Sequence, residues 1–161
     1  AYARLLKSYP DLELLLVGKP RPGGRTEKLV RRLGLTDKIQ FVSGISTQQM
    51  VHYYAEASIA VVPSVYEGFG LPAGEAMACG VPVVSTDGGA LPEVVGDAGL
   101  LVPVKNVDAL VEAIDRLLQD QQLRIELGAR GQQRIEESFC WHVCARQMTD
   151  YYRQVLSHAD R

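Results

Sequence analysis

The chain has 161 residues, of which 47% are hydrophobic and 22% are charged, and its formal net charge at pH 7 is −2. These values are typical of one soluble globular domain, and so small a net charge gives no broad attraction to nucleic acid or membrane. The sequence contains no apolar run of about 18 or more residues, so it predicts no membrane-spanning helix. The cysteines Cys79, Cys140 and Cys144 are odd in number in a chain that needs no disulfides at this size, which favours a reducing, cytoplasmic setting.

Short apolar runs alternate with amphipathic segments along the whole chain. The predicted strands are Leu12–Val17, Ile39–Val42, Ile59–Val62, a run that begins at Val83, and Gly99–Val102. The predicted helices are Ala1–Tyr9, the tail of a helix, then Thr26–Leu33, a helix from Ser46 or Thr47 to Ala57, Leu71–Cys79, Leu91–Val95, Val107–Leu118, Gln121–Glu137 and Phe139–Leu156. Thr26 is the expected N-cap of the second helix, and Ser46 or Thr47 that of the third. Trp141 is expected to pack the last helix. Strands that alternate with helices in this way predict a single doubly wound α/β domain over residues 1–161, with a five-stranded parallel sheet covered by helices on both faces.

Glycine turns follow four of the predicted strands, at Gly18, Gly44, Gly68 to Gly70, and Gly88 to Gly89. Ligands of open parallel sheets bind beyond the carboxyl ends of the strands. We therefore expect these turns to converge on one edge of the domain and to form its binding site.

The most informative stretch is Ser64–Thr86, which reads as a glycine loop, a helix and the next strand. A helix N-terminus offers unpaired N–H groups and the positive end of the helix dipole, which suit a phosphate. Two carboxylates, Glu67 and Glu75, are eight residues apart and can face one ligand, where each would accept paired hydrogen bonds from vicinal hydroxyls. The stretch therefore fits a sugar joined to a ribose through a diphosphate; the alternative is an ordinary turn between strand and helix with two solvated glutamates.

The residues from Glu67 to Pro72 read EGFGLP, and those from Glu75 to Val84 read EAMACGVPVV. This string resembles the motif of the retaining GT-B glycosyltransferases of family 4, in which seven residues separate two glutamates. The similarity extends over nearly the whole chain, but only to the C-terminal, Rossmann-like domain that binds the nucleotide-sugar donor. It implies that the N-terminal acceptor domain, and a first strand and basic loop that would precede Leu12–Val17, lie outside this sequence and that the chain is a piece of a longer enzyme.

The resemblance also implies what each residue would do. The implied donor-binding residues are Gly18, Ile45, Glu67, Gly68, Phe69, Gly70, Leu71 and Glu75. As the catalytic residue, Glu67 would bind hydroxyls of the transferred sugar, while the glycine loop would bind sugar and diphosphate through its N–H groups. Glu75 would bind the ribose diol, the backbone at Ile45 would pair with the base, and Gly18 would let the donor approach its strand. The donor is a nucleoside-diphosphate sugar, and no metal or other cofactor is expected.

Two functions remain open at this point. The first is half of a retaining glycosyltransferase, inactive without its acceptor domain, and the second is a stand-alone nucleotide-sugar-binding module. A nucleic-acid partner finds no support in the charge or the motifs. The basic stretch Lys19–Arg32 would be a solvated face, or a surface that attracts the donor diphosphate or the inner face of an anionic membrane as a peripheral contact.

The family's strand order gives a further expectation. In the order 3-2-1-4-5-6 the first strand is central, and that strand has no counterpart in this chain. We therefore expect Leu12–Val17 and Ile59–Val62 to flank a vacant position instead of pairing with each other.

Overall fold

The computed structural model describes residues 1–159 and shows an α/β fold with parallel strands. The strands are β1 (Leu14–Val17), β2 (Ile39–Val42), β3 (Ala60–Val62), β4 (Val83–Thr86) and β5 (Gly99–Val102). The helices are α1 (Tyr2–Leu5), α2 (Arg25–Arg32), α3 (Thr47–Glu56), α4 (Leu71–Ala78), α5 (Leu91–Val95), α6 (Val107–Gln119), α7 (Gln121–Ser138) and α8 (Trp141–Ala159). In this part of the chain no helix is both long enough and apolar enough to cross a membrane.

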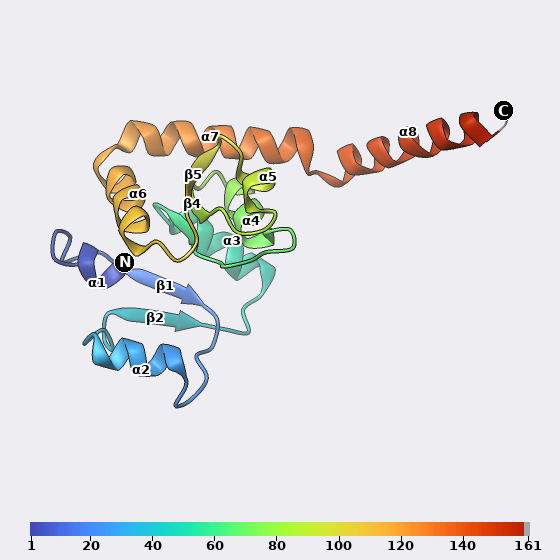
Figure 1. Ribbon diagram of the computed structural model, residues 1–161. Helices are drawn as coiled ribbons and strands as arrows, with labels where there is room; N and C mark the ends of the chain where they lie inside the picture. Colours follow the sequence, from blue (N-terminus) through green and yellow to red (C-terminus); the bar gives the residue numbers. More distant parts are fainter. Residues whose placement is uncertain (160–161) are drawn as a thin grey trace.

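All five predicted strands are present, and they pair in two parallel sheets. β1 pairs with β2, and β4 lies between β3 and β5. Figure 1 shows the β1–β2 pair with α2 alongside it, apart from the rest of the strands. Within residues 1–159, β1 makes no strand pair with β3, which confirms the prediction that these two strands do not pair.

The core lies on the two faces of the three-stranded sheet. All four residues of β4 are buried, and successive side chains point to opposite faces. Val83 packs in one cluster with Met77 of α4, whereas Val84 packs in a second cluster with Leu117 of α6. Helices therefore cover both faces of this sheet, as predicted from the apolar character of its strands.

The β1–β2 sheet is much less covered. Leu16 and Val17 are 36% and 51% exposed, and α2 contributes no fully buried residue. Figure 1 shows α2 alongside this sheet, and the partly exposed strands indicate that the sheet is less completely covered than the three-stranded one.

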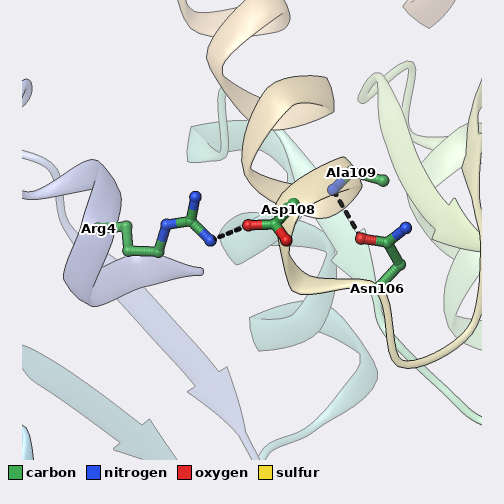
Figure 2. Close-up of polar contacts among 4 residues, drawn as sticks. All are labelled: Arg4, Asn106, Asp108 and Ala109. Atoms are coloured by element: carbon green, nitrogen blue, oxygen red, sulfur yellow. Dashed lines mark hydrogen bonds and ion pairs between the residues drawn. The ribbon is translucent and has the colours of Figure 1, made fainter.

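The N-terminal segment is attached to the main core through α6. Leu5 is 4% exposed and belongs to the second cluster. Figure 2 shows that Arg4 forms an ion pair with Asp108 in the first turn of α6, where Asn106 caps the helix by accepting a hydrogen bond from the N–H of Ala109 at 3.0 Å. A carboxylate at a helix N-terminus is favoured by the helix dipole, so the ion pair attaches α1 at an electrostatically favourable point.

Two helices differ from the sequence predictions at their N-terminal ends. Gly24, and not Thr26, is the N-cap of α2, because the helix already begins at Arg25 and places Thr26 inside its first turn. Trp141 begins α8 but is 90% exposed, so the expectation that it packs the last helix is wrong. Figure 1 shows the reason: α8 extends away from the body of the domain beyond the end of α7.

Of the two predicted caps of α3, the structure shows Ser46, and its role can be tested by mutation. The Ser46 hydroxyl accepts from the N–H of Gln49 at 3.2 Å, and the Gln49 side chain accepts from the N–H of Ser46 at 2.8 Å. Ser46→Ala is expected to lower the free energy of unfolding by about 1 kcal/mol, measured by urea denaturation. Thr47→Ala is the control, since it removes a hydroxyl one residue later without removing the cap. An equal loss in both variants would show that the cap is not the cause.

Candidate functional site

The candidate site begins where β3 ends and α4 starts. Gly70 is the N-cap of α4 and has φ of 95°, a left-handed conformation that glycine adopts without strain. Pro72 follows in the first turn, where a missing N–H costs no helical hydrogen bond. Among the described residues, the N–H groups of Phe69, Gly70 and Leu71 donate no backbone hydrogen bond. The N-terminus of α4 thus presents free donors together with the positive end of its dipole.

The turn after β4 supports the loop that carries Glu67. The Thr86 hydroxyl donates to the carbonyl of Ser64, and the N–H of Ala90 donates to the carbonyl of Glu67 at 3.0 Å. The backbone at Gly89 and the loop that carries Glu67 approach so closely that a Cβ atom placed on Gly89 would lie 2.2 Å from the Glu67 carbonyl oxygen. Two of the glycine turns predicted to converge, those after β3 and β4, are therefore in contact.

Ser64 orients the side chain of Glu67. Its Oγ donates to Glu67 Oε1 at 2.8 Å, and both residues are half-buried. The sequence motif alone gives Ser64 no role. The signal was the three-residue spacing, which allows a serine hydroxyl to reach a carboxylate within one turn.

A second part of the site is a cavity of about 190 Å³ between α3 and α4. Its lining residues are Ile45, Ser46, Thr47, Met50, Val51, Tyr54, Glu75 and Cys79. The structure thus brings together two residues predicted for the donor site, Ile45 and Glu75, which are 30 positions apart in the sequence. Val51 is 50% exposed and borders this cavity.

Tyr54 connects the two helices across the cavity. Its hydroxyl lies 3.4 Å from Glu75 Oε2 and 3.3 Å from the carbonyl oxygen of Pro72. Burial, and then the nearby Glu75 carboxylate, raises the pKa of Tyr54 to about 12. Burial likewise raises the pKa of the Cys79 thiol, with a smaller contribution from Glu75. The Tyr54 hydroxyl is therefore protonated at neutral pH and can donate a hydrogen bond. The spacing of residues in the sequence does not predict this role.

The remaining predicted residues lie outside this cavity. In the described part of the chain Gly18, Glu67 and Gly68 are not among its lining residues. The N–H of Gly18 instead donates to the Val42 carbonyl at 2.7 Å, beside β2. Leu71 is exposed, and Phe69 packs edge-on against Phe139 with ring centroids 5.7 Å apart.

The basic stretch forms a separate surface on α2. Arg31 is paired with Glu27 at 2.6 Å, whereas Arg25, Lys28 and Arg32 line a shallow cavity of about 590 Å³ together with Leu29. The attraction of a diphosphate or of an anionic membrane to this surface stays a prediction.

No group of three or more His, Cys, Asp or Glu side chains within residues 1–159 is arranged to hold a metal ion. The site offers a ligand the backbone donors at α4, the carboxylates of Glu67 and Glu75, and the polar groups around the cavity.

Curated proteins with related sequences are enzymes of sugar transfer. The chain is 43% identical over 150 residues to the MMP α-(1→4)-mannosyltransferase of Mycolicibacterium hassiacum, a match that covers 91% of this chain and 36% of that protein. It is 33% identical over 160 residues to the GDP-mannose-dependent monoacylated α-(1-6)-phosphatidylinositol monomannoside mannosyltransferase of Corynebacterium glutamicum, covering 93% of this chain and 41% of that protein. The chain therefore spans between a third and a half of the length of these relatives.

The fold is also found in solved structures. Sucrose-phosphate synthase from Thermosynechococcus elongatus superposes with a TM-score of 0.83 and 38% sequence identity, over 98% of this chain and 42% of that one. The sequence model of the family described as "Glycosyl transferases group 1" matches residues 1–134. This match covers most of the chain and includes both glutamates of the motif. The chain belongs to the group 1 glycosyltransferases.

Proposed function

We propose that this domain binds a nucleoside-diphosphate sugar and, together with the acceptor domain of a longer protein, transfers the sugar with retention of anomeric configuration. The observation that carries the proposal is the cavity that unites Ile45 and Glu75 beside the N-terminus of α4. A nucleoside has an apolar base and a polar diol, which suit a partly apolar cavity that contains a carboxylate. A diphosphate is an anion, which suits the neighbouring helix N-terminus.

The nucleoside would occupy the cavity between α3 and α4. The Glu75 carboxylate would accept hydrogen bonds from both hydroxyls of the ribose. The apolar side chains of Ile45 and Met50 line the same space and would contact the base, whose polar edge would pair with the backbone at Ile45. The pocket thus offers an apolar wall and a carboxylate to the two ends of a nucleoside.

The diphosphate would lie at the N-terminus of α4. The N–H groups of Phe69, Gly70 and Leu71 are available there, and the helix dipole favours negative charge. Glu67, held by Ser64, would bind hydroxyls of the transferred sugar, with Gly68 leaving room beside it and Gly18 leaving room beside β1. Stabilising the leaving diphosphate in this way supplies charge neutralisation without a divalent metal.

The names of the relatives support a hexose as the transferred group. One relative is a mannosyltransferase and another is described as GDP-mannose-dependent. We propose a nucleoside-diphosphate hexose as the donor of this protein. The free cysteines of the structure are compatible with the reducing, cytoplasmic setting in which we place the reaction.

Transfer would need both halves of the enzyme. Reacting groups must be held in a near-attack geometry, and this chain provides the donor side alone. We therefore propose that residues 1–161 bind the donor but do not transfer its sugar to an acceptor.

The different roles of the two carboxylates give the test of the proposed function. Glu75→Ala is expected to weaken binding of the bare nucleoside diphosphate by about 10- to 100-fold, because a charge-assisted hydrogen bond is lost. Glu67→Ala is expected to leave that affinity unchanged and to reduce the additional affinity of the sugar nucleotide. Isothermal titration calorimetry with UDP, GDP, ADP and their hexose derivatives, in the presence of EDTA, measures both.

Glu126→Ala on the exposed face of α7 removes the same charge away from the site and is the matched control. Equal effects of Glu67→Ala and Glu75→Ala on the bare nucleotide would contradict the division of roles. Absence of binding by the wild-type chain to every nucleotide tested would refute the proposed function itself.

A further inference from the structure

Tyr54 is placed to control the conformation of Glu75. The two residues come from different helices, and the tyrosine hydroxyl lies within hydrogen-bond distance of one carboxylate oxygen, Oε2, at 3.4 Å. The same hydroxyl lies 3.3 Å from the carbonyl oxygen of Pro72, in the first turn of the helix that carries Glu75. Tyr54 therefore holds both the side chain of Glu75 and the helical turn before it.

Glu75 needs such support. It is an exposed residue in the middle of α4, with a side chain of three rotatable bonds. Binding to a freely rotating side chain costs the conformational entropy that this side chain loses. The cost is smaller when the side chain is already held in its binding conformation. A hydrogen bond that holds Oε2 leaves Oε1 to face a ligand in the cavity that both residues line.

The direction of the hydrogen bond follows from the chemistry of the groups. A carboxylate and a carbonyl only accept, so the single proton of the phenol is shared between Glu75 and Pro72. Both distances are longer than the usual value of about 2.7 to 2.8 Å for an O–H···O bond, as expected for one donor divided between two acceptors. Removing the hydroxyl would release the carboxylate while leaving the aromatic ring to pack between the helices.

We propose that Tyr54 is a positioning residue that orients Glu75 toward the two ribose hydroxyls, so that the preference for ribonucleotides over 2′-deoxyribonucleotides depends on the Tyr54 hydroxyl. This inference rests on the proposed function. It assigns no contact between Tyr54 and the ligand; the tyrosine acts through the carboxylate alone.

The test compares a nucleoside diphosphate with its 2′-deoxy counterpart, using whichever of UDP, GDP and ADP binds the wild-type chain most tightly. Tyr54→Phe is expected to weaken ribonucleotide binding by about 3- to 10-fold, the usual range for disordering one side chain. It is expected to weaken 2′-deoxynucleotide binding less, because only the 3′-hydroxyl is left to bind Glu75. The ratio of the two affinities should fall accordingly. Calorimetric titration of each variant gives the ratio.

Two further variants separate orientation from packing. Tyr53→Phe removes the hydroxyl of the preceding, half-buried tyrosine, which is not among the lining residues of the cavity within the described chain, and should leave the ratio unchanged. In the Glu75→Ala background, Tyr54→Phe should produce no further change in the ratio, because the group it orients is already absent.

The outcomes are distinguishable. An equal loss of affinity for both nucleotides in Tyr54→Phe would show a packing role and overturn the inference, as would unchanged affinity for both. A further fall of the ratio in the Glu75→Ala background would show direct contact with the ribose and overturn it too. A wild-type chain that binds nucleotides without preferring ribose would defeat this inference alone, whereas a chain that binds none would defeat the proposed function as well.

Discussion

Gly128→Ala is expected to lower the free energy of unfolding by about 2 to 4 kcal/mol, although alanine is the better helix former by about 1 kcal/mol. Gly128 lies inside α7, and a Cβ atom there would come within 2.2 Å of the carbonyl oxygen of Gly80. That carbonyl belongs to the turn between α4 and β4, which is held by hydrogen bonds from the N–H groups of Gly80 and Val81 to Met77 and Ala76. The turn cannot yield without loss of these bonds, so α7 must move away from the core. Urea denaturation monitored by circular dichroism measures the loss.

Gly74→Ala in α4 is the matched control for the same substitution. A Cβ atom at Gly74 would meet its nearest neighbour, Ile135, at 3.8 Å, which is ordinary van der Waals contact. This variant is expected to be as stable as the wild-type chain or more stable, by up to about 1 kcal/mol. If Gly128→Ala proved equally stable, α7 would not be packed against the turn as closely as the structure shows.

Gly89→Ala is expected to reduce both the stability of the domain and its affinity for a nucleotide sugar. The residue has φ of 65°, and its Cβ atom would lie 2.2 Å from the carbonyl oxygen of Glu67 and 2.9 Å from the Glu67 nitrogen. The left-handed conformation costs alanine about 1 to 2 kcal/mol, and the close contact adds about 1 to 3 kcal/mol. The loop that carries Glu67 must move to relieve the contact, so the sugar-specific part of the affinity is expected to fall with the stability.

The comparison with Gly80→Ala separates the two causes. Gly80 has φ of 73°, but the nearest atom to its Cβ position, in the side chain of Gln132, is 3.9 Å away. Gly80→Ala should therefore lose stability because of backbone strain but should keep its discrimination between sugar nucleotides and bare nucleotides. Calorimetry and urea denaturation of both variants give the two quantities. Retained sugar discrimination in Gly89→Ala would show that the position of the loop does not depend on this contact.

The elements of the fold followed from local patterns in the sequence. β5 and α5 have the predicted bounds, because Gly, Pro and the apolar runs mark their ends directly. The N-cap of α2 does not follow from the sequence pattern, because Gly24 precedes the helix without a side-chain hydrogen bond, whereas the hydroxyl of Thr26 gives a stronger local signal. The exposure of Trp141 depends on the direction in which α8 leaves the domain, and no local pattern contains that information.

The candidate site was predictable where it is continuous in sequence and not where it is assembled in space. The glycine loop and the N-terminus of α4 lie within a few residues of each other, so their joint geometry followed from helix capping. The Tyr54–Glu75 contact joins residues 21 positions apart, and the support of Glu67 by Gly89 depends on how β4 follows β3 in the sheet. Both contacts need the tertiary structure, since propensity and periodicity describe one element at a time.

The β1–β2 sheet and the three-stranded sheet differ in burial, and we expect them to open to solvent at different free energies. Local opening requires less free energy where fewer buried contacts break, and the β1–β2 sheet has few of them, whereas every residue of β4 is buried. Backbone amides in Leu14–Val17 should therefore exchange with solvent deuterons by local opening, while those of Val83–Thr86 exchange only when the core unfolds. Ile45 follows β2 and Glu75 lies in α4, so we expect the wall of the proposed nucleoside cavity at Ile45 to be more labile than the wall at Glu75.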